Sequence, residues 1–558
     1  MGTTLCGSGR DGDHCGLAAG SASAATRYIR GDSALASGTC VDSANPCTAA
    51  YVLNGAGAIA QDGDTVIALR SFSPFVVSAQ ITIQKAIALR GQDGPRPTFY
   101  GNLGTTIFSL TAPGVQLSHL RVQNVNAGSG ALSASASVTI DDAVIDGAGY
   151  SFGASAGPLT VTDTLMRCGA TSFVCMTMNG GANPVTLRRV HVDDSFAPPN
   201  GGSSGSISAS TLLIEDSSFA ATSSGLTAFA TTAGTIRRVT ATAANGALTV
   251  VGPMVVSDSA FLNPSGGAAF ASAGSQTVQL RNVTAVSHGD QSYGITAGGG
   301  QNVFGSITPG APIVARNVIA RGDTADLNAA DGFCFSAPCS PPAPSGAITV
   351  DHSNFRTTAG SGTITKGAGN QSADPLFAGA EDFHLLAGSP AIEAGLADAL
   401  DGPTDLDGNP RVAGAAPDMG ADEGTPPPPA PAPAPAAVDT TAPTLAGLKI
   451  TRNGAQIRFS LSEAAKATLT INRLLKGRRS GKRCVKSTAK LRKAKRCTRH
   501  VKVRSQVVTG TVGTNTVKGK ALAPGTYEVL LTAVDAAGNK TTSTLAAKLV
   551  VKRAKKKR

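Results

Sequence analysis

A short pattern of apolar and polar residues recurs through the middle of the chain, from about Leu117 to Phe355. Each copy has alternating apolar residues, one polar residue and then a second short apolar run, as in Val138-Thr-Ile-Asp-Asp-Ala-Val-Ile145. Successive copies lie roughly 20–35 residues apart, a spacing typical of a solenoid. Alternation with a period of two indicates β-strands, so the pattern predicts a β-solenoid.

A second, less polar strand lies between these copies, as in Gly225-Leu-Thr-Ala-Phe-Ala230 and Gly267-Ala-Ala-Phe-Ala-Ser272. Three short strands per turn with Gly, Ser and Asn corners predict a right-handed parallel β-helix. The fold class expected is therefore all-β, with about 10–11 coils stacked one on another over residues 36–372. The 66 Gly residues and the charged fraction of only 15% suit narrow coils with tight corners.

The polar residue between the two apolar runs of each copy is here called the pivot. The pivots that we single out are Asp142, Asp163, Arg189, Asp216, Arg238, Asp258 and Asn282, with His119, Asn317 and His352 at equivalent places. Stacked coils are about 4.8 Å apart, so the pivots from Asp163 to Asp258 predict a ladder of alternating charge. Exposed ion pairs contribute only about 0–1 kcal/mol each, so the ladder would serve mainly to hold the register of the coils.

All ten cysteines fall into close pairs, which predicts disulfides and an oxidising, extracellular or cell-surface location. The pairs are Cys6/Cys15, Cys40/Cys47, Cys168/Cys175, Cys334/Cys339 and Cys484/Cys497. Their spacing does not match a zinc site. The N-terminus shows no export signal, and no apolar run is long enough to span a membrane.

Charge is divided unevenly along the chain. Residues 444–558 hold 29 Lys and Arg against 3 Asp and Glu, whereas residues 1–443 hold 19 against 33. A basic patch is expected between the last two cysteines, formed by Lys486, Lys490, Arg492, Lys493, Lys495 and Arg496. Because interleaved aromatic residues are missing, nucleic acid is not the expected partner. Anionic envelope polymers are expected instead, and a merely solubilising loop is the alternative.

After Phe355 the repeat gives way to a different series of motifs, including Gly388-Ser-Pro-Ala-Ile-Glu-Ala-Gly395, Asp405-Leu-Asp-Gly-Asn-Pro-Arg411 and Pro417-Asp-Met-Gly-Ala-Asp-Glu423. This series resembles the C-terminal segment of bacterial surface β-helix proteins of the choice-of-anchor Q type. The coils before it resemble the pectate-lyase-like superfamily. The resemblance implies that residues 373–424 complete and close the helix.

The remaining segments are assigned from composition and pattern. Residues 1–35 form an N-terminal extension, and residues 425–443 are a Pro/Ala-rich linker. Residues 444–558 alternate as half-buried strands and resemble a small bacterial Ig-like or fibronectin-like β-sandwich. The chain is expected to be a monomer.

The resemblance implies that an enzyme of this fold would carry catalytic carboxylates on one outward sheet face. In the lyases these carboxylates hold calcium beside a basic residue. The less polar strands show almost no charge, so no catalytic residue, metal ligand or cofactor is assigned. Asp405-x-Asp407-Gly408-Asn409 lacks the later ligands of a calcium loop and is interpreted as an Asx-rich turn. We therefore expect a secreted or cell-surface, non-catalytic protein that binds glycans or envelope polymers in recognition or adhesion. The alternatives are a polysaccharide lyase or glycoside hydrolase with a divergent site, which could need calcium, and a structural envelope spacer.

Overall fold

The computed structural model describes residues 23–126, 129–147, 152–154, 157–169, 174–194, 202–298, 311–330, 345–424 and 439–553. The chain divides into two compact units, Met1–Pro428 and Pro429–Arg558, and each is described by itself. The cysteines Cys6, Cys15, Cys334 and Cys339 and most of the linker lie outside the described residues.

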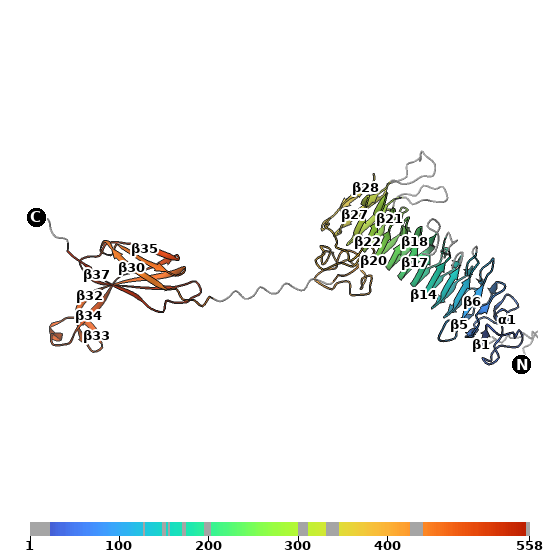
Figure 1. The fold of residues 1–558 in the computed structure, drawn as a ribbon, viewed down its shortest axis with the longest axis horizontal. Coiled ribbons are helices and arrows are strands. Elements are labelled where there is room, and N and C mark those ends of the chain that lie inside the picture. The colour runs from blue at the N-terminus through green and yellow to red at the C-terminus, as the bar shows by residue number, and fades with distance from the viewer. Residues whose placement is uncertain are drawn as a thin grey trace, which may run out of the picture. The chain divides into compact units, whose positions relative to one another are not determined.

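The first unit is a parallel β-solenoid whose strands stack in three columns (Figure 1). The first column holds the strand that precedes each pivot. It also contains strands of coils without a pivot, before the first pivot and after the last. Its strands are β1 (Thr26–Arg30), β2 (Thr65–Leu69), β5 (Ala88–Gly91), β8 (Val115–Ser118), β11 (Val138–Asp141), β14 (Leu159–Cys168), β16 (Val185–Asp194), β17 (Ser203–Ala221), β18 (Ser224–Thr242), β20 (Met254–Asn263), β22 (Val278–Ser287), β24 (Ile313–Arg316), β27 (Ala347–Asp351) and β29 (Thr363–Lys366).

The second column follows the pivots. It contains β3 (Phe75–Val76), β6 (Thr98–Gly101), β9 (Arg121–Asn124), β12 (Val144–Gly147), the later parts of β14, β16, β17, β18, β20 and β22, and β25 (Ile319–Gly322).

The third column holds the less polar strands. It contains β4 (Ile81–Ile83), β7 (Phe108–Leu110), β10 (Leu132–Ala134), β13 (Phe152–Ala154), β15 (Met176–Asn179), the first parts of β17 and β18, β19 (Leu248–Val251), β21 (Gly267–Ala273), β23 (Ser292–Ala297), β26 (Ala325–Ala329) and β28 (Thr358–Ala359).

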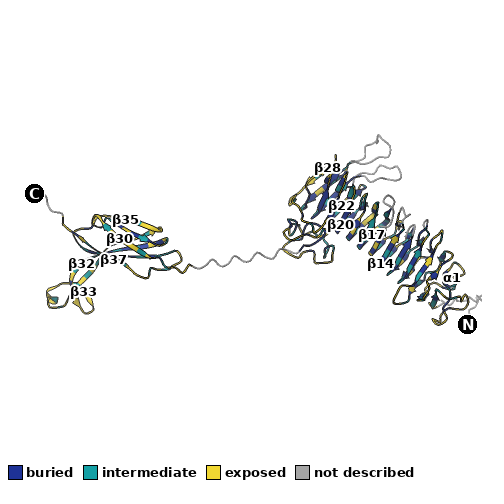
Figure 2. Ribbon diagram, viewed as in Figure 1, coloured by how far each residue is buried: buried dark blue, intermediate teal, exposed yellow. Residues whose placement is uncertain are grey.

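The core of the solenoid is built from equivalent apolar residues that stack coil upon coil. Figure 2 shows the buried residues along these strands in dark blue. Ile140, Val161, Leu187, Ile214 and Ile236 are in register with one another, and each is 0% exposed. Burying a side chain of this size contributes about 1.5–3 kcal/mol. The alternation seen in the sequence thus places one face of every strand inside the coil.

The solenoid begins earlier than the predicted boundary at residue 36. Strand β1 lies within the segment assigned to the N-terminal extension, yet it pairs in parallel with β2. Ile29 is completely buried, and the Nε of Arg27 lies 2.6 Å from a carboxylate oxygen of Asp64. The short helix α1 (Ala49–Leu53) packs against this first coil.

The segment 373–424 lies along the side of the last coils, whereas the resemblance implies that it closes their end (Figure 1). Most residues of β20 and β22 are buried on both faces as a consequence. The backbone of the segment consists mainly of turns and isolated β-bridges. The segment also has a small apolar cluster, in which Leu385, Ala391 and Met419 pack against Ile319 of β25.

The second unit consists of two antiparallel sheets that share one apolar core. One sheet contains β30 (Leu445–Thr451), β31 (Gln456–Leu461) and β35 (Gly513–Lys518). The other contains β32 (Ala465–Ser480), β33 (Arg483–Lys486), β34 (Arg496–Gly510), β36 (Gly525–Val534) and β37 (Leu545–Val551). The 3-10 turns η1 (Arg452–Gly454) and η2 (Ala489–Leu491) complete the unit.

Candidate functional site

The pivots are the points at which the backbone of each coil turns from the first column into the second. All ten have a positive φ, between 43° and 55°. This left-handed conformation costs about 1–2 kcal/mol for most residues, but Asn and Asp tolerate it comparatively well. That preference explains the Asp and Asn pivots, whereas His and Arg pivots need contacts of their own to offset the strain.

The exposed pivots form ion pairs between neighbouring coils. The guanidinium of Arg189 donates to both carboxylate oxygens of Asp163, at 2.5 and 2.7 Å. Arg238 donates to Asp216 in the same way, at 2.5 and 3.1 Å. The hydrogen bond to Asp163 is the main cause that raises the pKa of Arg189, and Asp216 adds a weaker attraction. Between Asp163 and Asp258 the described pivots therefore form two bidentate pairs, where the sequence predicts a continuous ladder.

A three-member ladder does exist one residue before the pivots, in a row that the sequence analysis missed. Glu215 accepts from Arg188 at 2.8 Å and also pairs with Arg237 on the opposite side. The three residues are in register on β16, β17 and β18, and the Glu215 side chain is only 5% exposed. Recurrence of Arg, Glu and Arg at this position of successive repeats is the sequence signal that could have found it.

Three later pivots are covered by segment 373–424, and two of them are amides. Asp258, Asn282 and Asn317 are 0% exposed. Asn317 donates to Asn282 at 2.9 Å, and Asn282 donates to Asp258 at 3.0 Å. An amide can be buried with its hydrogen bonds satisfied at much lower cost than a charge, which explains why Asn stands at the covered coils.

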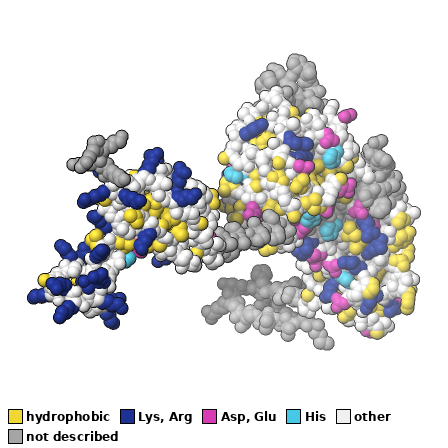
Figure 3. Space-filling view, turned by 60° about the vertical axis from the view of Figure 1, so that its left-hand side comes forward, with side chains coloured by type: hydrophobic (Ala, Val, Ile, Leu, Met, Phe, Trp, Pro, Cys, Tyr) yellow, Lys and Arg dark blue, Asp and Glu magenta, His cyan; other side chains and the backbone are white. Residues whose placement is uncertain are grey.

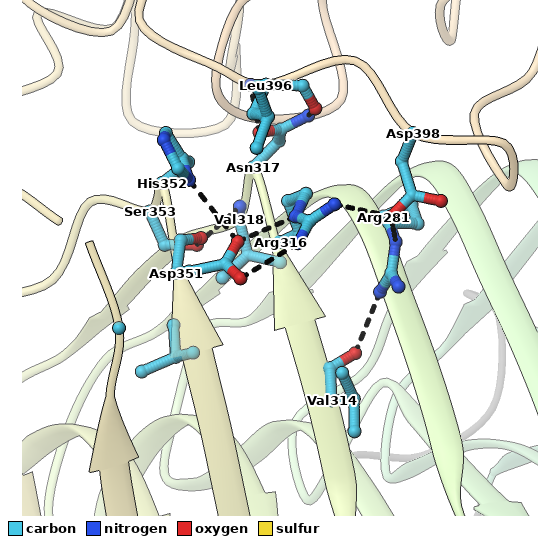
Figure 4. A network of polar contacts seen from close by, with 12 residues as sticks. Arg281, Val314, Arg316, Asn317, Val318, Asp351, His352, Ser353, Leu396 and Asp398 are labelled. Atoms are coloured by element: carbon cyan, nitrogen blue, oxygen red, sulfur yellow. Dashed lines mark hydrogen bonds and ion pairs between the residues drawn. The ribbon is translucent and has the colours of Figure 1, made fainter. Parts of the chain in front are cut away.

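Ion pairs fasten the segment to the coils beside these amides (Figure 4). Asp398 accepts from Nε of Arg281 and from a terminal nitrogen of Arg316, both at 2.8 Å. Arg316 also binds both oxygens of Asp351, at 2.7 and 3.0 Å. Leu396 completes the attachment, because its backbone N–H donates to Asn317 at 2.8 Å and its carbonyl accepts from the same amide at 3.0 Å.

A buried carboxyl within the segment titrates far from its usual range. Asp418 is 1% exposed, and burial raises its pKa to about 7, although its oxygens accept from the backbone N–H groups of Glu393 and Gly424. The neighbouring Glu423 charge raises the pKa of Asp418 further. Because the folded pKa exceeds the ordinary value of 3.8, the folded state holds this proton more tightly than the unfolded state.

This linkage predicts that Asp418 makes the solenoid less stable as the pH rises from about 4 to about 7. The loss is at most about 1.4 kcal/mol per pH unit and is complete above the folded pKa. Asp418→Asn should flatten the difference in free energy of unfolding between pH 5 and pH 8, as measured by urea titration with circular dichroism. The amide side chain is expected to lower the free energy of unfolding at both pH values. Its NH2 group would face one of the backbone N–H groups that the Asp418 oxygens now accept from. An unchanged difference between the two pH values would contradict the assignment.

A groove of about 610 Å³ lies where the edge of segment 373–424 meets the second column. Its floor is a row of residues in register across β16, β17, β18 and β20, namely His191, Ser218, Thr240 and Ala260. Its wall comes from the segment and includes Glu381, Phe383, Leu406 and Ala421. The sequence did not predict this groove.

Four ionisable side chains of the segment meet at this groove. Nε2 of His384 lies 2.6 Å from a carboxylate oxygen of Asp407 and 4.0 Å from one of Asp422. Nδ1 of the same ring contacts Asp382. The hydrogen bonds to Asp382 and Asp407 raise the pKa of His384 to about 9, so the ring is protonated at neutral pH in this arrangement.

Asp405 and Asn409 form the turn that positions Asp407 in the groove wall. One carboxylate oxygen of Asp405 accepts from the backbone N–H of Asp407 at 3.0 Å and of Asn409 at 2.7 Å. This is the geometry of an Asx turn, as the sequence predicts for this stretch.

A second group of carboxylates close enough to hold an ion lies in the other unit and consists of Asp439, Glu463 and Asp535.

The outward face of the third column carries small side chains, as expected from the sequence. One row of residues in register along it contains Ser109, Ser133, Gly153, Thr177, Ser206, Thr227 and Thr249. None of the residues in this row can act as an acid or base near neutral pH. The ionisable groups described above lie instead at the pivots, in the row before them and in the groove.

The predicted basic patch lies on an arm that projects from the second unit. Strand β32 pairs with β36 only as far as Arg473, whereas its pairing with β34 continues to Arg478. Residues 474–500 therefore form a ribbon beyond the shared core, and we call this ribbon the basic arm. All six predicted residues are exposed on it: Lys486, Lys490, Arg492, Lys493, Lys495 and Arg496.

Three of the five predicted disulfides lie among the described residues, and all three are formed. They are Cys40–Cys47, Cys168–Cys175 and Cys484–Cys497. The last one joins the two sides of the basic arm, where the apolar core does not reach.

The fold defines the class of this protein as a parallel β-solenoid joined to a separate unit of two small antiparallel sheets. No protein-family model matches the chain, and no curated protein matches it either. The resemblance to pectate-lyase-like and choice-of-anchor Q proteins accordingly rests on the motifs alone. In the part of the chain that the structure describes, no helix is long and apolar enough to cross a membrane.

Proposed function

We propose that this chain is a secreted or cell-surface, non-catalytic β-helix protein that attaches to anionic polymers of an extracellular envelope through the basic arm. The observation that carries the proposal is the uncompensated charge of the arm. None of its six patch residues forms an ion pair with any described residue, and no Asp or Glu occurs between Glu463 and Glu528. Figure 3 shows a cluster of Lys and Arg side chains, in dark blue, on the second unit.

Like charges face each other across the arm. Arg478 stands directly opposite Arg496 in the antiparallel pairing of β32 with β34. Like charges at such cross-strand positions are destabilising. An exposed sheet surface of this kind attracts an anionic polymer, and the attraction falls as salt screens it.

Two further observations support the extracellular and sandwich parts of the proposal. Disulfides persist in oxidising compartments, and three are formed here. The hydroxyl of the buried Tyr527 donates to the carbonyl of Ala523 at 2.7 Å, a contact similar to the tyrosine corner of Ig-like sandwiches. The choice-of-anchor Q resemblance of residues 373–424 fits a surface-displayed protein of bacterial type.

The test is binding of the full chain to an immobilised sulfated polysaccharide, a polyuronate and neutral dextran at low and high salt. The variant Lys490→Gln, Arg492→Gln, Lys493→Gln, Lys495→Gln should lose about tenfold or more in affinity for the anionic polymers at low salt, since a basic residue near an anionic surface contributes about 1 kcal/mol. The matched control is Lys449→Gln, Arg458→Gln, Lys518→Gln, Lys520→Gln, which removes the same charge from the other sheet and the segment just after it and should retain binding. Equal loss in both variants, or binding independent of salt, would contradict the proposal.

A polysaccharide lyase or hydrolase is the second candidate, and the carboxylates of the groove beside Arg238 are the observation that favours it. Against it, Asp382 and Asp407 are already paired with His384, and Arg238 with Asp216. The same polymer mixtures, assayed for new reducing ends or unsaturated uronides, should remain uncleaved. Cleavage that is lost in Asp407→Asn would favour the enzyme, and failure to bind any polymer would favour a structural spacer.

A further inference from the structure

The groove beside segment 373–424 contains a set of metal-ligating atoms that the sequence did not indicate. Nε2 of His384 and one carboxylate oxygen each of Asp407 and Asp422 all lie within 4.8 Å of one another. Two ligands on opposite sides of one divalent ion are about 4–5 Å apart, because each lies about 2.0–2.4 Å from the metal. The three atoms can therefore converge on a single ion after only small side-chain movements.

The orientation of His384 is set by a residue outside this trio. Asp382 contacts Nδ1 of the ring and also accepts from the backbone N–H of His384 at 3.2 Å. The ring therefore directs Nε2 toward Asp407 and Asp422. Metal-binding histidines usually have their second nitrogen held by a carboxylate in this way, which fixes the tautomer and the ring orientation.

Asp422 adds a largely buried carboxylate to this set of ligand atoms. Its side chain is only 9% exposed. One of its carboxylate oxygens accepts from the backbone N–H of Leu385 at 3.3 Å. The other has no hydrogen bond among the described residues, and its nearest cationic atom is Nε2 of His384 at 4.0 Å. A cation held by His384 and Asp407 would lie close enough to bind this oxygen as well.

From this geometry we propose that His384, Asp407 and Asp422 bind one divalent transition-metal ion of the Zn²⁺ type, which takes the place of the Nε2 proton and releases it to solvent. An imidazole ligand favours zinc and similar ions over calcium and magnesium, which prefer oxygen ligands alone. Three protein ligands leave at least one coordination position facing the open groove, where water or a small oxygen ligand would bind.

The other carboxylate group, Asp439, Glu463 and Asp535, serves as an internal control. It has no imidazole, and Asp535 already accepts from the side chain of Asn539 at 2.9 Å. Glu463 is only half-buried. A site of this kind would prefer Ca²⁺ if it bound an ion at all.

The test is calorimetric titration of the full, tag-free chain with ZnCl2, MnCl2 and CaCl2 after removal of metals with a chelator. One Zn²⁺ ion per chain is expected to bind at the groove. His384→Ala and Asp407→Asn should each weaken that binding at least about tenfold, and Asp382→Asn should weaken it about 10–100-fold, because it orients the imidazole. Both His384 and Asp407 are exposed, so the folded solenoid should survive these changes, which circular dichroism can verify.

Glu381→Gln is the matched control, because it removes a neighbouring negative charge from the groove without removing a ligand. It should leave Zn²⁺ binding within about twofold of the unaltered chain. Absence of Zn²⁺ binding, binding that survives His384→Ala, or equal losses in Glu381→Gln and Asp407→Asn would each overturn the proposal. Zn²⁺ binding that is lost in Asp439→Asn but kept in His384→Ala would place the ion in the other unit and would also overturn the proposal.

Discussion

Arg411→Ala is expected to release segment 373–424 from the coils and to lower the free energy of unfolding by about 3–5 kcal/mol. The Arg411 side chain is 3% exposed and lies 2.7 Å from Glu423 and 3.7 Å from Asp258. It also donates to the backbone carbonyls of Gly420 and Asp418. Its removal leaves two buried carboxylates without their main counter-charge. Urea unfolding followed by circular dichroism, together with limited proteolysis of the segment, measures the effect.

The control for this prediction is an Arg–Asp pair at the exposed end of the same pivot column. Arg189→Ala removes the partner of Asp163, but both side chains are about half exposed, so the expected loss is within about 1 kcal/mol. The same segment should remain resistant to protease. If the two substitutions cost equally little, burial of the Arg411 network would not be what holds the segment in place.

Phe270→Ala is expected to lower the free energy of unfolding of the solenoid by about 3–5 kcal/mol, because it opens a cavity in the narrow apolar core inside the coils. Phe270 is 0% exposed, is in register with Leu248 and Ile295 of the neighbouring coils, and contacts Phe261 with ring centroids 5.7 Å apart. In a solenoid each coil contacts only its neighbours, so the cavity weakens the interfaces on both sides of one coil. Urea unfolding of the full chain gives the magnitude.

Phe229→Ala is the matched control, because the same residue type stands on the outward face of β18 with 38% of its surface exposed. This substitution should change the free energy of unfolding by no more than about 0.5 kcal/mol. A similar loss in both variants would contradict the assignment of inward and outward faces to the third column.

The predicted elements depend on information that is local in the sequence. Alternating apolar residues specify which face of a strand is buried, and a polar residue at constant phase marks the turn between two columns. For that reason the alignment of the repeats located all ten left-handed pivots and the three-strand coil. The close cysteine pairs could be read in the same way, since a short loop brings both sulfur atoms together. The start of the solenoid was placed too late, because β1 lies well before the first coil that carries a pivot.

The candidate site depends on contacts between residues far apart in the chain. Arg411 meets Asp258 only because the segment after the last coil folds back along the side of earlier coils. His384, Asp407 and Asp422 are scattered over one irregular segment and converge only when its turns pack against β18 and β20. No periodicity links these residues, so the sequence by itself determined a stack of coils, its pivots and a basic arm. The tertiary structure decided where the segment lies, which pivots are buried, and where ionisable groups gather, because the energy of burying a charge depends on its neighbours in space.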